Sequence, residues 1–459
     1  MPDLVVRGGR VYTPDGFRAF DVRVEGGRIV EVDAEVARGG PEVDAGGLLV
    51  LPGAVDAHVH SRDPGFPSKE DFASLTAAAA AGGVTTVVDM PNTVPTVDGP
   101  EVFEEKAASA AGKALVDFAL WGAIRSSTEP AHIAALAEAG AAGFKAYLGY
   151  AFRLRERQIV YTAEPGGAEL EAPPDYGTLA SLAPAIRAHS LPLAVHAEDP
   201  AVLHRFSRPL TTYADLLAAR PALAEAIAVA ALGALSSETG LAVHVVHLSS
   251  RAGLRAALEA RRAGASLTLE TCPQYLWLTE ADYERLGASM KVYPAVRTAD
   301  DQAALREALR RGGLEIVATD HAPHADEEKL GRSLEDALPG SPGVETLYLS
   351  CLELARAWGD PGAAVRWASE GPARMLGIHP RKGAIQPGAD ADLVLVDPAV
   401  ETVVSAERMH SRQRHGALEG QRFGFAMRAV YSRGVLVAAD GEPVRGEGRG
   451  MLVRPEIRT

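Results

Sequence analysis

The chain has 459 residues, of which 47% are hydrophobic and 23% charged, and its formal net charge is −14 at neutral pH. This composition is typical of a globular protein large enough for two or three domains. The acidic balance argues against nucleic acid and anionic membranes as partners. Apolar runs stay shorter than the roughly 18 residues of a membrane span, so we expect no membrane-spanning segment.

Cys272 and Cys351 are the two cysteines, too few for a disulfide framework. A reducing cytoplasm is therefore the expected location. The first residues do not follow the basic-then-apolar layout of a secretory signal, which agrees with that expectation.

Both ends of the chain have the pattern of short β-strands. Apolar and polar residues alternate between glycine pairs in residues 4–13 and 20–32, and the same pattern returns in residues 389–398 and 429–444. We therefore expect two flanking segments to combine into one small β-sandwich domain. These segments are residues 1–52 and 385–459.

The middle of the chain, residues 53–384, alternates short apolar runs with Ala/Leu/Glu-rich helical segments. This alternation predicts an α/β fold of the (β/α)8 TIM-barrel type. The eight predicted strands are residues 53–60, 85–90, 117–123, 143–149, 191–199, 241–249, 266–273 and 314–323.

Residues 151–177 interrupt this alternation with a long, charged segment that is rich in proline and glycine. Long loops in compact domains often act as lids or binding loops. A surface hairpin insertion is the alternative, and the sequence favours neither.

Histidine and acidic side chains gather at the ends of the predicted strands. His58 and His60 alternate along one strand, so both imidazoles point to the same side. His196, His247 and Asp320 end three later strands. The carboxyl ends of the strands in such a barrel form the face that carries the active site. Because imidazoles and carboxylates are zinc ligands, the pattern predicts a metal centre there.

Lys145 lies in an intervening strand, within the stretch GFKAYLG. Four imidazoles and one carboxylate can ligate two divalent ions, which need a bridging anion. A lysine desolvated beside cations has a lowered pKa, and its neutral amine can take up carbon dioxide. The resulting carbamate is a carboxylate that could bridge the two ions.

Several motifs together resemble one family. They include PGAVDAHVHSRDPG (residues 52–65), GFKAYLG (143–149), ATDHAPH (318–324) and GADADLVLVDP (388–398). By these motifs the chain is similar to the cyclic amidohydrolases of the amidohydrolase superfamily, which include dihydroorotase, allantoinase and hydantoinase.

The resemblance implies a binuclear zinc site in a homodimer or homotetramer. One ion would take His58, His60 and Asp320, the other would take His196 and His247, and a carboxylated Lys145 would bridge them. The resemblance also implies that a shared hydroxide attacks an amide carbonyl of a small cyclic ureide. Asp320 would accept the proton of that hydroxide and pass it to the leaving nitrogen.

Arg62, Asn92 and His324 bear on the choice of substrate. A ring that carries a carboxylate needs cationic or hydrogen-bond donor groups aimed at that anion. Family dihydroorotases are similar to this chain at all three positions. The resemblance therefore favours a dihydroorotase, which interconverts dihydroorotate and N-carbamoyl-aspartate in pyrimidine synthesis.

Other positions favour allantoinase or hydantoinase/dihydropyrimidinase. Gln274 and Tyr293 depart from the dihydroorotase pattern, and the lysine of GFKAYLG is closer to allantoinases and hydantoinases. A non-catalytic homologue that serves as an assembly partner is a further alternative, against which the intact ligand set argues. Cys272 could be read as a nucleophile, but we expect a small buried residue there.

Overall fold

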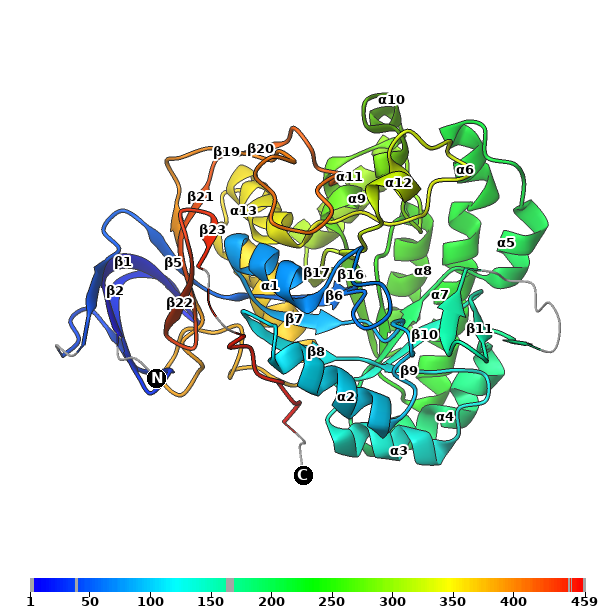
Figure 1. Cartoon of the computed structure of the whole chain (residues 1–459), viewed down its shortest axis with the longest axis horizontal. Coiled ribbons are helices and arrows are strands. Elements are labelled where there is room, and N and C mark those ends of the chain that lie inside the picture. Colours follow the sequence, from blue (N-terminus) through cyan, green and yellow to red (C-terminus); the bar gives the residue numbers. More distant parts are fainter. Residues whose placement is uncertain (1–3, 38–39, 162–168, 445, 447, 457–459) are drawn as a thin grey trace.

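The computed structural model of the chain describes residues 4–37, 40–161, 169–444, 446 and 448–456. A β-rich part built from both chain ends lies beside a larger part in which helices surround strands (Figure 1). The expected (β/α)8 barrel with a β-sandwich domain is confirmed.

Strands from the two chain ends form one sheet, of nine strands in the described residues, in which β5 pairs with β1 on one side and β18 on the other. Its order is β23-β22-β21-β18-β5-β1-β2-β3, with β4 beside β1. All nine strands lie within the two expected end segments, whose boundaries stay a prediction. The strands are β1 (Leu4–Thr13), β2 (Gly16–Glu25), β3 (Arg28–Asp33), β4 (Glu42–Asp44), β5 (Leu49–Pro52), β18 (Leu393–Asp397), β21 (Ala426–Ser432), β22 (Val435–Ala439) and β23 (Glu442–Pro443); β19 (Thr402–Val403) and β20 (Arg422–Phe423) form a separate pair.

The barrel consists of parallel strands that follow one another around the ring in chain order. The ring closes where Val59 pairs with His321 and the amide of His60 donates to the carbonyl of His321 at 2.7 Å. The strands are β6 (Ala54–Val59), β7 (Val84–Asp89), β8 (Asp117–Leu120) with its continuation β9 (Gly122–Ala123), β10 (Phe144–Tyr147), β14 (Leu193–His196), β15 (Val243–Val245), β16 (Leu267–Thr271) and β17 (Ile316–Val317).

The last barrel strand is shorter than the expected 314–323. Beyond Val317, the carboxylate of Asp56 accepts hydrogen bonds from the amide and the hydroxyl of Thr319, at 3.1 and 2.5 Å. Hydrogen bonds to this side chain thus hold the backbone at Thr319. The chain then turns at Asp320, whose φ is +49°.

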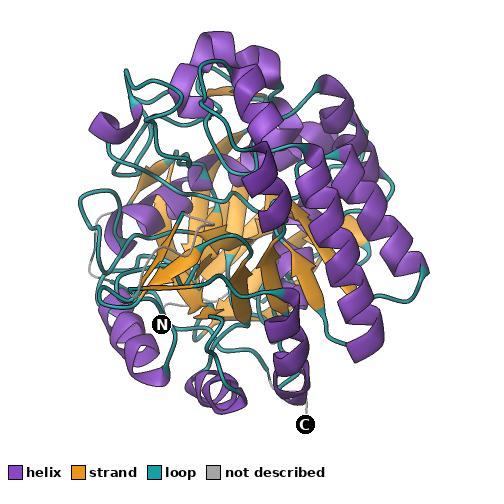
Figure 2. Ribbon diagram, turned by 90° about the vertical axis from the view of Figure 1, so that its right-hand side faces the viewer, coloured by secondary structure: helices purple, strands orange, loops and turns teal. Residues whose placement is uncertain are grey.

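Helices enclose the barrel strands on the outside (Figure 2). Four of the longer helices begin at side-chain N-caps, at Asp71, Asp175, Ser250 and Thr298. The main helices are α1 (Phe72–Ala81), α2 (Pro100–Ala111), α3 (Pro130–Ala139), α4 (Tyr176–Ala188), α7 (Ala222–Thr239), α8 (Arg251–Arg262), α11 (Ala299–Arg310) and α13 (Leu347–Ala357). Shorter helices are α5 (Pro200–Phe206), α6 (Tyr213–Ala219), α9 (Pro273–Trp277), α10 (Tyr283–Leu286), α12 (Asp326–Lys329), α14 (Gly362–Val365) and α15 (Gly371–Met375).

The stretch Tyr213–Thr239, which contains α6 and α7, is long and apolar enough to cross a membrane by length and composition alone. From the sequence we expected no such stretch. In the structure, Ala224, Val229 and Leu232 of α7 are buried, and α7 packs against α8 and α4. Since core helices meet the same criterion, this stretch is weak evidence for a membrane span.

Residues 151–177 form a small antiparallel sheet between β10 and α4. It contains β11 (Ala151–Arg153), β12 (Gln158–Val160) and β13 (Leu170–Glu171); residues 162–168 of the segment lie outside the described residues. Arg125 fixes this sheet to the barrel, because its guanidinium binds both Glu171 and Asp98.

A buried charge cluster joins the barrel to the composite sheet. The ammonium of Lys382, which is fully buried, lies 2.6 Å from Asp117 at the start of β8. It also lies 2.7 Å from Asp392 and 3.1 Å from Asp390, both just before β18. Three carboxylates thus share one buried cation.

Replacing Lys382 with methionine is expected to lower the free energy of unfolding by about 3–5 kcal/mol, because the buried carboxylate of Asp392 loses the ammonium that lies 2.7 Å away. Urea denaturation measures this change. Arg255→Ala is the control, since Arg255 is exposed and its pair with Glu259 spans 4.0 Å. Equal free energies of unfolding for the two variants would contradict the stabilising role of Lys382.

Candidate active site

The carboxyl ends of the barrel strands bring all five predicted strand-end residues together. His58 lies on β6 and His60 follows it, His196 ends β14, and His247 and Asp320 follow β15 and β17. The five side chains line one pocket. The five side chains therefore lie on one face of the barrel.

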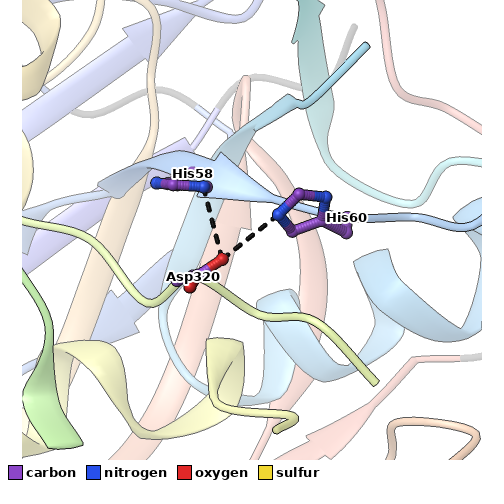
Figure 3. A group of neighbouring side chains, drawn as sticks. All are labelled: His58, His60 and Asp320. Atoms are coloured by element: carbon purple, nitrogen blue, oxygen red, sulfur yellow. Dashed lines mark hydrogen bonds and ion pairs between the residues drawn. The ribbon is translucent and has the colours of Figure 1, made fainter. Parts of the chain in front are cut away.

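Asp320 contacts the imidazoles of both His58 and His60 (Figure 3). Its Oδ1 lies 3.3 Å from Nε2 of His58 and 3.1 Å from Nε2 of His60. The ligand atoms of the three residues all lie within 4.8 Å of one another. This is the spacing of a site for a metal ion.

The protonation of these imidazoles fits a cation. Nδ1 of His58 lies 2.9 Å from Oε1 of Glu270, and Nδ1 of His60 lies 2.7 Å from Oδ1 of Asn92. Both acceptors hold the proton on Nδ1 and leave the lone pair of Nε2 directed at Asp320. Burial also lowers the pKa of His60 to about 4, so its ring is neutral at pH 7.

His196 and His247 form a second pair of imidazoles beside the group of His58, His60 and Asp320. Nδ1 of His196 lies 2.8 Å from Nε2 of His247, and Nε2 of His196 lies 2.9 Å from Oε2 of Glu198. Glu198 thereby leaves Nδ1 of His196 free to face His247. Two imidazole nitrogens at this distance require a shared proton or a cation. The ring centroids of His58 and His247 are 5.4 Å apart, so the two ligand sets adjoin.

Lys145 on β10 is fully buried, and within the described residues its Nζ has no hydrogen-bond partner. Burial lowers the pKa of Lys145 to about 7. About half of such amines are neutral at pH 7 and able to react with carbon dioxide. The lysine therefore has the chemistry that a carbamate requires.

Three site residues adopt left-handed backbone conformations, which side chains larger than glycine rarely adopt. The φ angles are +60° at Arg62, +41° at His247 and +49° at Asp320. Such strain persists where surrounding contacts enforce it, and it gathers at functional sites.

Asn92 and Arg62 differ in their position relative to the pocket. Asn92 borders the pocket and contacts the ring of His60. Arg62 is buried, and its Nε donates to the carbonyl of Pro323 at 3.1 Å. Its guanidinium also lies 3.4 Å from Nε2 of His324.

His324 is held by the backbone as well. Its Nε2 lies 3.0 Å from the carbonyl of Pro339, which lines the pocket. Burial lowers the pKa of His324 to about 3, so the ring is neutral at pH 7. Arg62 and His324 therefore meet each other, but each is also bound to a carbonyl group.

Sequence reasoning missed the carboxylates that contact the imidazoles of His58 and His196 on the side away from the other site residues. Glu198 contacts His196 and is itself bound by Arg220, and Glu270 contacts His58. An acidic residue two positions after His196 was a signal for Glu198. No such local signal marks Glu270, because β16 places it opposite His58 only in the folded barrel.

The inserted sheet also contributes to the pocket. Ile159 and Val160 at the end of β12, and Tyr161 after them, line it together with the metal-ligand side chains. The segment is therefore part of the pocket wall. Tyr161 remains about half exposed, at 51%.

Comparisons with known proteins agree with this geometry. The model of the "Amidohydrolase family" matches residues 49–437. The chain is 37% identical to an allantoinase of Rubrobacter xylanophilus over 99% of this chain and 98% of that one. It is 33% identical to a dihydroorotase of Geotalea daltonii over 92% and 95% of the two chains. The solved structure of an L-hydantoinase (dihydropyrimidinase) from Arthrobacter aurescens covers 99% of this chain and 100% of its own, with a TM-score of 0.90 at 29% identity.

The chain belongs to the amidohydrolase family. Within this family it falls in the cyclic amidohydrolase branch, and it is a hydrolase of carbon–nitrogen bonds in cyclic amides. This class excludes the alternative of a non-catalytic assembly partner.

Cys272 is the N-cap residue of α9, where a thiol nucleophile could have been expected. Its side chain is fully buried, and burial raises the pKa of its thiol well above the usual range. The thiolate is the reactive form, so Cys272 has the character of an inert buried residue.

Both cysteines are expected to resist thiol reagents in the native protein. Cys351 is also buried, and burial raises the pKa of its thiol to about 12. Titration with Ellman's reagent should detect close to none of the two thiols in buffer and both in denaturant. Rapid labelling in buffer, lost on Cys272→Ser, would mean that Cys272 is reactive.

Proposed function

We propose that the enzyme opens the ring of a neutral cyclic ureide, as an allantoinase does, with two divalent ions at its active site. The supporting observation is the 37% identity to the Rubrobacter allantoinase over nearly the full length of both chains. The dihydroorotase is less similar and matches a smaller share of the chain. The dihydroorotase function expected from the sequence is therefore not specifically supported.

The contacts of Arg62, His324 and Gln274 agree with a substrate whose ring carries no charge. Nε of Arg62 donates to the carbonyl of Pro323, and Nε2 of His324 contacts that of Pro339. Gln274, a departure from the dihydroorotase pattern, donates to the carbonyl of Thr319 at 3.3 Å. These groups have backbone partners without a substrate carboxylate.

The metal centre that we propose uses the ligands described above. His58, His60 and Asp320 would hold one ion, His196 and His247 the other, and a carbamate on Lys145 would bridge them. Two divalent ions, most suitably Zn²⁺ for this set of nitrogen and oxygen donors, supply Lewis-acid activation of water and of the amide carbonyl.

The protein's own groups handle the proton and the substrate oxygen. Asp320 borders the pocket, where its carboxylate accepts the proton of the attacking water and returns it to the leaving ring nitrogen. Tyr150 also lines the pocket, 3.4 Å from Nε2 of His196. Burial raises the pKa of Tyr150 well above its usual range, so its hydroxyl keeps a proton to donate.

Dihydroorotase activity is the second candidate. The guanidinium of Arg62 lies beside His324, and a substrate carboxylate could replace their backbone partners. The two candidates differ in whether the ring carries a negative charge.

The zinc-loaded enzyme is expected to hydrolyse allantoin with a kcat/KM at least about 100-fold above that for dihydroorotate, since a buried unmatched carboxylate costs several kcal/mol. Ring opening of allantoin, hydantoin and dihydroorotate should be measured side by side. A preference for dihydroorotate would refute the proposal.

Arg62→Ala separates the candidates further. If the substrate is neutral, the variant should change KM for allantoin by less than about 5-fold, a loss near 1 kcal/mol. A rise of KM confined to dihydroorotate would assign Arg62 to a carboxylate. Arg255→Ala, at an exposed position on α8, is the control.

Lys145→Ala is expected to lower kcat by about 10³-fold or more, because the group proposed to bridge the two ions is lost. Short carboxylic acids should restore part of the activity by occupying the same space. Unchanged metal content without rescue would contradict the carbamate.

The pH dependence of the carbamate follows from the pKa of Lys145, about 7. Only the neutral amine reacts, so incorporation of ¹³C-bicarbonate into the metal-free protein should rise between about pH 6 and pH 8. NMR detection of the carbamate carbon measures this, with Lys145→Ala as the blank. A constant or falling signal would be inconsistent with the lowered pKa.

A further inference from the structure

We propose that Glu270 on β16 is a positioning residue that couples the two metal-ligand sets. This inference rests on the metal centre of the proposed function and does not depend on which ring is the substrate. Glu270 contacts the imidazole of His58 in the first set and the backbone of His247 in the second.

One oxygen of Glu270 serves both ligand sets. Oε1 lies 2.9 Å from Nδ1 of His58 and accepts from the amide of His247 at 3.1 Å. Oε2 lies 3.2 Å from Nε2 of His244. The side chain is fully buried, so these three contacts replace water around the carboxylate.

For His58, the contact decides which nitrogen faces the ion. Glu270 can only accept at neutral pH, so Nδ1 of His58 carries the proton and Nε2 presents its lone pair beside Asp320. A carboxylate behind a ligand imidazole fixes the ring and raises its basicity.

For His247, the contact stabilises a strained backbone. The φ of His247 is +41°, a left-handed conformation that is strained in a residue with a side chain. The Glu270 carboxylate accepts from the His247 amide, and the Glu270 carbonyl accepts from the next amide, that of Leu248, at 2.7 Å. One residue of β16 thus holds the turn that aims His247 at His196.

His244 completes the arrangement on the side away from the ligands. Its Nδ1 lies 2.9 Å from the hydroxyl of Thr268, and its Nε2 contacts Oε2 of Glu270. His244 contacts Glu270 without being a ligand, so it offers a way to disturb the carboxylate indirectly.

The test compares Glu270→Gln with Glu225→Gln. Glu225 of α7 is also a buried carboxylate, but its partners are Ser249 and Ser250, and it has no hydrogen bond or ion pair to a proposed metal ligand within the described residues. Zinc affinity is measured by chelator competition, zinc content by mass spectrometry, and Tm on metal-free and zinc-loaded protein.

We expect Glu270→Gln to weaken zinc binding by roughly 10- to 100-fold at both ions, with a smaller rise of Tm on zinc loading than in the wild type. Glu225→Gln should lower Tm of metal-free and loaded protein alike and leave zinc affinity within about 2-fold, a change below 0.5 kcal/mol. A Glu270→Gln variant that behaves like Glu225→Gln would overturn the proposal, as would weakening at one ion alone.

His244→Gln covers the case in which Glu270→Gln does not fold. This variant should bind zinc a few-fold more weakly with a native circular dichroism spectrum; unchanged zinc affinity would count against the coupling. Failure of the proposed function is distinguishable, because it would be seen as absent zinc or absent ring opening in the wild-type chain itself.

Discussion

The active site depends on several imidazole nitrogens that face one another at the buried end of the barrel. Each arrangement is enforced from behind by an acceptor: Glu270 for His58, Asn92 for His60 and Glu198 for His196. Each acceptor holds a proton on the ring nitrogen that it contacts, so the lone pair of the other ring nitrogen faces the pocket, where a cation could bind it. Burial lowers the pKa of His60, His196 and His247, which favours the neutral form of these three rings.

The barrel supplies the rigidity that this convergence needs. Parallel strands carry the ligands, while the turns after β15 and β17 hold His247 and Asp320 in left-handed conformations. Hydrogen bonds donated to the carboxylates of Glu270 and Asp56 stabilise these turns. Lys382 links the same barrel to the composite sheet through buried carboxylates of both parts.

Catalytic class and substrate are set by different parts of the pocket. The strand ends carry the proposed metal ligands, whereas the loops and the inserted sheet provide much of the surrounding wall. Arg62 illustrates the difference, since an arginine typical of an anion subsite is here bound to the carbonyl of Pro323. The substrate therefore has to be decided by comparing charged and neutral rings.

The sequence by itself determined the barrel, the β-rich chain ends and the strand-end positions of His58, His60, His196, His247 and Asp320, because strand alternation and strand order are local properties of the chain. It also indicated that desolvation could lower the pKa of Lys145 and let its neutral amine react with carbon dioxide. Only the tertiary structure brought Glu270 behind His58, bound Arg62 to a backbone carbonyl and placed the segment around β12 at the pocket. Those contacts join residues that lie more than a hundred positions apart or in separate loops. Strand register and loop packing decide which residues meet, and local sequence patterns do not encode either of them.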